Sequence, residues 1–177
     1  MKILFISLGC DKNLADSEEM LGLLTGNGHE IVDSEEEADA IVINTCCFIH
    51  DAKEESVNTI LEMAEYKKTG TCKILIVTGC MAQRYKEEIT KEIPEVDAVL
   101  GTTSYGDIVK ALNEAEAGHV FQEFKDINAL PEDSGRRVIT TGGHFGYLKI
   151  AEGCDKHCTY CIIPSLRGKF RSVPEER

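Results

Sequence analysis

The chain has 177 residues, of which 42% are hydrophobic and 28% are charged, a composition typical of a folded protein and not of a disordered one. The net charge of −12 is unevenly placed, because residues 1–148 carry −14 and residues 149–177 carry +2. An acidic body repels a phosphate backbone, so direct nucleic-acid binding by this portion is not expected.

No apolar run reaches the ~18 residues of a membrane span, and the apolar N-terminus is too short for a signal peptide. We therefore expect a cytoplasmic protein without a membrane partner.

Strands and helices are predicted to alternate along the first 117 residues. Runs rich in β-branched side chains predict strands, and apolar residues at helical spacing between them predict helices. The strands are expected over 2–8, 29–32, 40–45, 73–78 and 97–100, and the helices over 16–24, 52–68, 85–93 and 106–117. This alternation predicts an α/β domain with a mostly parallel, flavodoxin-like sheet in the strand order 2-1-3-4-5 and with helices on both faces.

The residues that follow are predicted to form a linker and the beginning of a second domain. Proline and several glycines lie among charged residues in 123–145, a pattern typical of a linker, which can hold one hairpin. A strand is expected over 146–151, running directly into Cys154. The predicted organisation is an α/β domain over 1–122, a linker over 123–145 and the start of a second domain over 146–177.

Three of the eight cysteines closely follow predicted strands: Cys10, Cys46 and Cys80. Disulfides are poor candidates in a reducing compartment, which favours metal or redox roles. The carboxyl ends of parallel strands share one edge, and the first, third and fourth strands of a flavodoxin-like sheet are neighbours about 5 Å apart. One cysteine at a strand end is typically a plain buried residue, but three in register can share a metal centre. Structural zinc prefers four protein ligands, whereas three thiolates suit a [4Fe–4S] cluster with one open iron.

Two other cysteines, Cys47 and Cys72, are expected to be inert thiols. Adjacent residues of an extended segment point to opposite sides, so Cys46 and Cys47 cannot easily serve one centre. Cys72 precedes its strand and is therefore expected at the opposite end of the sheet.

A second group of cysteines, Cys154-x-x-x-Cys158-x-x-Cys161, comes just after the expected strand over 146–151. Three cysteines within so short a segment can wrap a loop around a single cluster. A ferredoxin supplies four thiolates, whereas three leave one iron able to bind an outside ligand. A zinc loop that uses His157 is the alternative, but Cys158 is the better ligand and the two neighbouring side chains diverge.

This cysteine spacing is that of radical S-adenosylmethionine (SAM) enzymes, and the whole chain resembles their methylthiotransferase family. The matching stretches are Ser7–Asn13, Asn44–Ile49, Gly79–Tyr85, Tyr147–Cys161, Ile163-Pro164, Arg167-Gly168 and Arg171-Ser172. The resemblance implies two [4Fe–4S] clusters, one on each cysteine trio, with SAM bound at the open iron of the second. It also implies that Tyr160 packs near the adenine of SAM, for which plain core packing is the alternative.

The activity that the resemblance implies is sulfur insertion into an unactivated C–H bond, followed by methylation. Asp11–Asn13 and Cys46–Ile49 resemble the branch that modifies the β-carbon of an aspartate in ribosomal protein uS12; the tRNA-adenosine branch is the alternative. The expected partners are uS12 or the small ribosomal subunit, and a reducing electron donor of the flavodoxin or ferredoxin type. An alternative of another class is a two-cluster electron carrier or cluster-binding module, but each trio lacks the fourth thiolate that a carrier uses.

The second domain is expected to be the beginning of a radical SAM (β/α) barrel. Such a barrel needs on the order of 200 residues, and residues 146–177 hold its first strand and cluster loop. We therefore expect a truncated barrel that lacks the family's glycine-rich SAM segment and C-terminal TRAM domain, and a chain that is inactive by itself.

Overall fold

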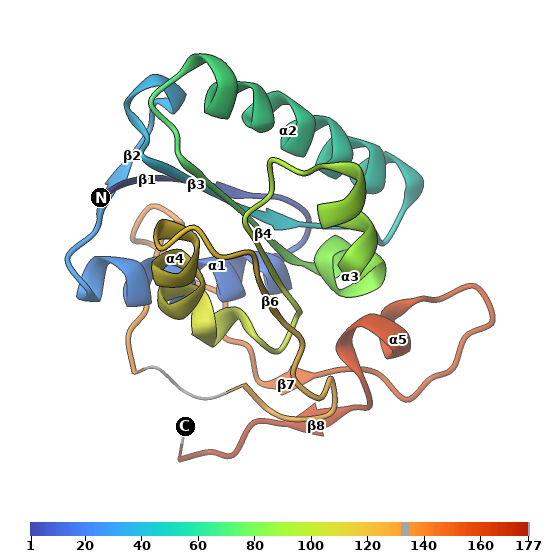
Figure 1. The fold of residues 1–177 in the computed structure, drawn as a ribbon. Coiled ribbons are helices and arrows are strands. Elements are labelled where there is room, and N and C mark those ends of the chain that lie inside the picture. The colour runs from blue at the N-terminus through green and yellow to red at the C-terminus, as the bar shows by residue number, and fades with distance from the viewer. Residues whose placement is uncertain (132–134, 177) are drawn as a thin grey trace.

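A computed structural model describes residues 1–131 and 135–176 and shows an α/β domain followed by a C-terminal segment (Figure 1). Six parallel strands form one sheet in the order β2-β1-β3-β4-β5-β6. The strands are β1 (Lys2–Ser7), β2 (Glu30–Val32), β3 (Ala40–Thr45), β4 (Ile74–Gly79), β5 (Ala98–Leu100) and β6 (Phe121–Glu123). The helices of this domain are α1 (Asp11–Gly26), α2 (His50–Thr69), α3 (Cys80–Glu92) and α4 (Ile108–Glu116), with single 3-10 turns η1 (Glu35–Glu37) and η2 (Tyr105–Asp107).

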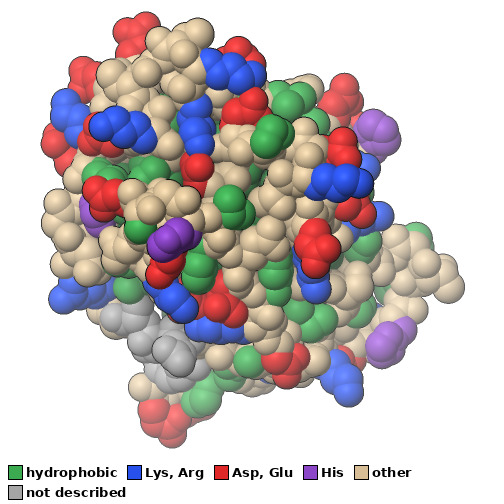
Figure 2. Space-filling model, in the orientation of Figure 1, with side chains coloured by type: hydrophobic (Ala, Val, Ile, Leu, Met, Phe, Trp, Pro, Cys, Tyr) green, Lys and Arg blue, Asp and Glu red, His purple; other side chains and the backbone are tan. Residues whose placement is uncertain are grey.

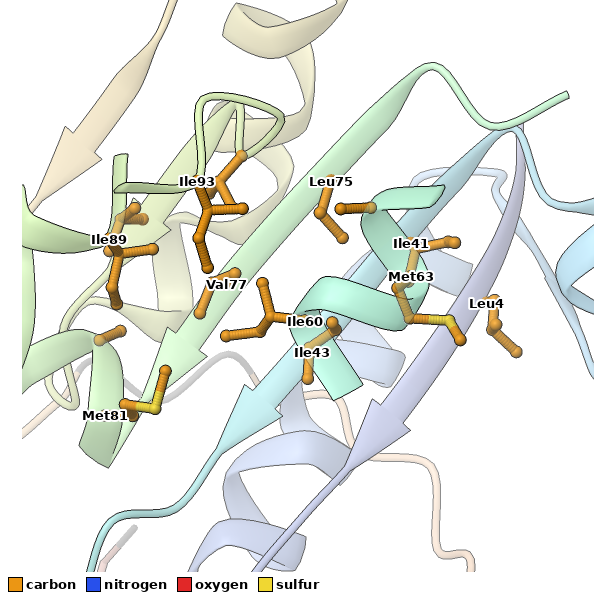
Figure 3. Packing of buried hydrophobic residues seen from close by; sticks show 14 of the residues in the cluster. Leu4, Ile41, Ile43, Ile60, Met63, Leu75, Val77, Met81, Ile89 and Ile93 are labelled. Carbon is orange, nitrogen blue, oxygen red and sulfur yellow. The ribbon is translucent and has the colours of Figure 1, made fainter. Parts of the chain in front are cut away.

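The continuous apolar runs of β3 and β4 form the centre of the sheet, where both faces are buried. On one face, the strands pack against α2 and α3 in the cluster that Figure 3 shows, which includes Leu4, Ile41, Ile43, Ile60, Met63, Leu75, Val77, Met81 and Ile89. On the other face, α1 and α4 cover a second cluster that includes Ile3, Met20, Val42, Ile76, Ile108 and Leu112. The two layers of helices hold the strands in register and so determine where their carboxyl ends lie.

The predicted α/β class, the parallel sheet and the flavodoxin-like order of the first five strands are confirmed. β6 is an addition to the prediction, and it extends the sheet beyond β5. Its three residues, Phe-Gln-Glu, are too few and too polar to show a strand pattern, so pairing with β5 decides their conformation.

Two helices begin earlier than predicted, directly beside cysteines. α1 begins at Asp11 instead of residue 16, with Cys10 as its N-cap residue, and α3 begins at Cys80 instead of residue 85. α3 is kinked at Lys86, whose φ is +27°, so the helix predicted from residue 85 corresponds to the part of α3 after the kink. The first turns of α1 are polar but buried, at Asn13 and Asp16 among others. Apolar periodicity therefore begins after the helix has begun. The consequence is that Cys10 and Cys80 lie at the N-termini of α1 and α3.

The C-terminal segment differs from the predicted strand over 146–151. The strand found there, β7, covers Ala151–Glu152 and pairs antiparallel with β8 (Arg171–Ser172), while a short helix, α5 (Ile163–Arg167), lies between them. The apolar side chains of Leu148 and Ile150 are exposed in the described chain, although the carbonyl of Ile150 accepts from Val173 N at 2.9 Å, next to β8. The assignment of this segment to the start of a (β/α) barrel stays a prediction.

The predicted linker over 123–145 begins inside β6, which ends at Glu123; its other described residues, 124–131 and 135–145, form no helix or strand. The hairpin that the sequence allows falls partly on residues 132–134, which lie outside the described residues. A contact with α1 holds the end of the linker, since Arg137 Nε donates to Glu18 Oε2 at 2.8 Å.

Among the residues that the structure describes, no helix is both long and apolar enough to cross a membrane. Acidic and basic side chains are intermingled on the face of the molecule that Figure 2 shows. That nucleic acid is not a direct ligand of this portion stays a prediction.

Candidate metal-binding site

The carboxyl ends of β1, β3 and β4 bring three cysteines to one edge of the sheet. These strands are neighbours and their registers set their last residues nearly level. Cys46 and Cys80 directly follow β3 and β4, and Cys10 follows the end of β1 by three positions. Cys46 and Cys80 are buried, whereas Cys10 is exposed, and all three are free thiols. We call this group the strand-end trio.

Gly9 allows the loop after β1 to approach Cys46. Its φ of +93° lies in the left-handed region that favours glycine. A Cβ atom at Gly9 would lie 2.7 Å from Cys46 Cβ and 3.0 Å from Cys46 Sγ. Glycine at this position therefore lets the backbone that carries Cys10 pack directly on Cys46.

Cys80 lies beside a buried cation that comes from the far end of the chain. Burial raises the pKa of the Cys80 thiol, whereas the charge of the Arg167 guanidinium and a hydrogen bond with it act to lower that pKa. Arg167 is the last residue of α5, so the C-terminal segment reaches the strand-end trio.

Buried charges surround Arg167, and sequence reasoning did not find them. Arg167 Nη1 donates to Asp16 Oδ2 at 2.6 Å and lies 3.5 Å from Glu152 Oε1. Lys149 forms ion pairs with Asp16 and, at 3.0 Å, with Glu152. We call Asp16, Lys149, Glu152 and Arg167 the buried ion network. The sequence signal for it is the charged pair Lys149 and Glu152, three positions apart in an otherwise apolar run.

Cys46 and Cys47 have different surroundings. The N–H of Cys46 donates to Ser56 Oγ at 3.0 Å, while the Cys47 side chain packs in the apolar cluster between the sheet and α2 and α3. Burial, with the nearby Cys80 thiol as a further cause, raises the pKa of Cys47 to about 11. Cys72 is buried at the amino end of β4, where burial raises its pKa as well. Cys80 belongs to the same apolar cluster and its pKa is raised by burial as well, so these surroundings do not separate ligands from inert thiols, and the inertness of Cys47 and Cys72 stays a prediction.

A metal ion would require the strand-end trio to draw closer together. In residues 1–131 and 135–176, no three His, Cys, Asp or Glu side chains converge closely enough to hold a metal ion as they stand. The donor set nevertheless fits an iron–sulfur cluster, because the three free thiols lie on adjacent strand ends and two of them are at helix N-termini. The exposed side chain of Cys10 is the one that has most room to turn.

The second trio, Cys154, Cys158 and Cys161, lies in the loop between β7 and α5, which projects away from the sheet in Figure 1. Cys154 N donates to the carbonyl of Gly168 at 3.0 Å, and Cys161 N donates to the carbonyl of Cys158 at 3.0 Å. These bonds hold both ends of the loop, while Cys158 is exposed and the other two cysteines are half-buried. The thiol donor set of this loop likewise fits a cluster.

Tyr160 is 87% exposed, so it does not pack into a core of the described chain. Plain core packing, one of the two roles weighed for this residue, is therefore not found here. A position near the adenine of SAM stays a prediction.

The fold and the cysteines together define a class of protein. Its members have a parallel α/β domain with three cysteines at the carboxyl edge of the sheet, followed by a loop that carries three more cysteines. The sequence model of the uncharacterized protein family UPF0004 matches residues 2–101, and the chain belongs to this family.

Several curated relatives carry a more particular name. The chain is 67% identical over 177 residues, all of its length, to the ribosomal protein uS12 methylthiotransferase RimO of Lachnoclostridium phytofermentans. It is 52% identical over 172 residues, 97% of the chain, to the protein of that name from Clostridioides difficile, and 48% identical over 176 residues, 99% of the chain, to that of Geobacter sulfurreducens. The chain spans 40% of the first relative and 39% of the other two. The resemblance to methylthiotransferases is therefore confirmed.

Proposed function

We propose that each cysteine trio holds one [4Fe–4S] cluster, the first on Cys10, Cys46 and Cys80 and the second on Cys154, Cys158 and Cys161. The observation that carries this proposal is the position of Cys10, Cys46 and Cys80 at the ends of three adjacent strands. Residues so far apart in sequence share one edge without any disulfide between them. Three thiolates per cluster leave one iron open to a ligand from outside the protein.

We further propose that the chain forms the first part of a radical SAM methylthiotransferase. The α/β domain carries the strand-end trio, and residues 146–177 begin the SAM-binding domain. When bound, the clusters and SAM supply the radical and sulfur-transfer chemistry of such an enzyme. The chain's own contribution is to hold each cluster on three thiolates, to place the positive charge of Arg167 beside Cys80, and to present Tyr160 next to the second trio.

The proposed substrate is an aspartate of ribosomal protein uS12, free or in the small ribosomal subunit. The names of the relatives support this choice, since relatives up to 67% identical are called uS12 methylthiotransferases. The acidic charge of residues 1–148 suits a basic ribosomal protein better than a phosphate backbone. A reducing protein of the flavodoxin or ferredoxin type is the proposed electron donor.

Restoring the gene to cells that lack it should add the mass of one methylthio group to an aspartate of uS12 and leave tRNA adenosine unmodified. Mass spectrometry of uS12 and of digested tRNA, from the same cells, measures both products. If methylthioadenosine returns while uS12 keeps its unmodified mass, the assignment of uS12 as the substrate is wrong, and the tRNA-modifying alternative is correct.

The adjacent cysteines provide a second test. We expect Cys46→Ser to lose the iron of the strand-end trio and Cys47→Ser to keep it, because adjacent side chains of an extended segment point to opposite sides. Iron and sulfide are measured after anaerobic reconstitution of the whole protein, with Cys72→Ser as the matched control for a buried thiol. The reverse result would show that Cys47 is the ligand.

A further inference from the structure

Asn13 is a fully buried residue of α1 that touches the ends of all three cysteine-bearing strands. Its Nδ2 donates to the carbonyl of Leu8, after β1, at 2.9 Å, and to the carbonyl of Thr45, the last residue of β3, at 2.9 Å. Its Oδ1 accepts from the Cys80 thiol, directly after β4, at 3.8 Å. A thiolate at Cys80 has no proton to donate, so the two bonds to carbonyls are the ones that hold the segments when Cys80 is a ligand. One amide therefore connects three segments that are distant in the sequence.

The orientation of this amide is determined by its surroundings. Nδ2 faces two carbonyl oxygens, which accept only, while Oδ1 faces the guanidinium of Arg167, which donates only. The bond from Arg167 Nη2 to Asn13 Oδ1 is 2.6 Å long. A flipped amide would place like groups against each other at all of these contacts, which is costly at a buried site.

Arg167 is itself held in place by residues of both the α/β domain and the C-terminal segment. Its Nη1 donates to Asp16 Oδ2 at 2.6 Å, one turn along α1 from Asn13. Its side chain is buried and also lies near Glu152 of β7. The guanidinium thus joins the C-terminal segment to the amide that contacts the strand ends.

We propose that Asn13 is the positioning residue of the strand-end trio and that Arg167 locks the Asn13 amide in the required orientation. The inference rests on the proposed metal-binding role of Cys10, Cys46 and Cys80. It deepens that role, because it names the groups that hold the three cysteine-bearing segments at a fixed separation. Groups that orient metal ligands in this way contribute strongly to metal affinity.

The decisive variant is Asn13→Asp, which keeps the shape of the side chain and its pairing with Arg167. It replaces the amide NH₂ with an oxygen, so that acceptors oppose the carbonyls of Leu8 and Thr45. The background is the whole protein with Cys154, Cys158 and Cys161 replaced by alanine, so that iron at the second trio does not contribute. Co²⁺ titration, followed by thiolate-to-cobalt absorption, reports how many thiolates gather without requiring cluster assembly.

We expect Asn13→Asp to weaken Co²⁺ binding by roughly 10- to 100-fold and to lower the absorption per bound Co²⁺. Arg167→Lys should shift both readouts in the same direction by a smaller amount, because it keeps the charge but cannot donate to Asn13 and Asp16 together in the same geometry. The matched control is Arg137→Gln, which breaks a partly buried bond between α1 and the later part of the chain without touching Asn13. It should leave both readouts unchanged.

Equal Co²⁺ affinity and absorption in Asn13→Asp and its parent would overturn the positioning role. The same result in Arg137→Gln as in Asn13→Asp would overturn it too, since general loosening of the fold would then explain the loss. The parent protein, with Cys154, Cys158 and Cys161 replaced by alanine, could bind Co²⁺ through its thiolates and respond to Asn13→Asp, yet never assemble an iron–sulfur cluster. This result would support the positioning role and reject the proposed function. A parent protein that binds neither Co²⁺ nor an iron–sulfur cluster would overturn both.

Discussion

Replacing Cys10, Cys46 and Cys80 together with alanine should reduce the iron bound by the reconstituted whole protein from about eight to about four atoms per chain. The physical reason is that a cluster needs all of its thiolates, and these three lie on adjacent strand ends. Iron and sulfide analysis after anaerobic reconstitution measures the stoichiometry, and EPR spectroscopy of the reduced protein identifies the cluster that remains.

The complementary replacement of Cys154, Cys158 and Cys161 should remove the other half of the iron. It should also abolish the change in the EPR spectrum on addition of SAM, because the proposed SAM-binding iron belongs to the second trio. Replacing Cys72, a buried thiol at the opposite end of the sheet, is the control and should leave the iron content unchanged. Full iron content after loss of the strand-end trio would refute the first cluster while leaving the second intact.

Asp16→Asn should lower the free energy of unfolding by about 3–5 kcal/mol, because it removes one of the two carboxylates that pair with the buried Arg167 and with Lys149. Burial by itself would raise the pKa of the Asp16 carboxyl, but the charges of Arg167 and Lys149 outweigh burial and hold it below its usual value. Asp16 is therefore ionised near neutral pH, and its loss leaves Glu152 as the main counter-charge of the buried Arg167 and the partly buried Lys149. Urea denaturation followed by circular dichroism measures the loss.

The control for this variant is Glu37→Gln, which removes an ion pair of 3.1 Å between two exposed side chains, Lys2 and Glu37. Exposed pairs contribute about 0–1 kcal/mol, so this change should have little effect on stability. If the two variants are equally stable, the buried ion network does not hold the C-terminal segment to α1.

Much of the fold can be predicted from the sequence because its strongest signals are local. The consecutive branched side chains of Ala40–Thr45 and Ile74–Gly79 favour strands that are buried on both faces, and helical spacing between them favours a parallel sheet. From that sheet alone, Cys10, Cys46 and Cys80 are expected at one edge, where the structure places them. The spacing Cys154-x-x-x-Cys158-x-x-Cys161 likewise needs no tertiary information.

Other features have no local signal. β6 is formed by pairing with β5, and the first turn of α1 is hidden in the sequence because its buried residues are polar. The predicted strand over 146–151 is wrong in its extent because an apolar run forms a strand only where a partner strand is beside it, and here pairing with β8 begins at Ala151.

The sequence by itself determined the class of the sheet, the edge that carries the strand-end trio, and the three-cysteine loop, since each follows from periodicity, strand order or spacing along a short segment. Only the tertiary structure decided which polar groups meet at that edge. Asn13 and Arg167 are 154 positions apart, yet they share a hydrogen bond of 2.6 Å. Burial explains why this pairing is specific: a donor left unpaired in the interior costs free energy, and which acceptor it finds depends on how distant segments pack.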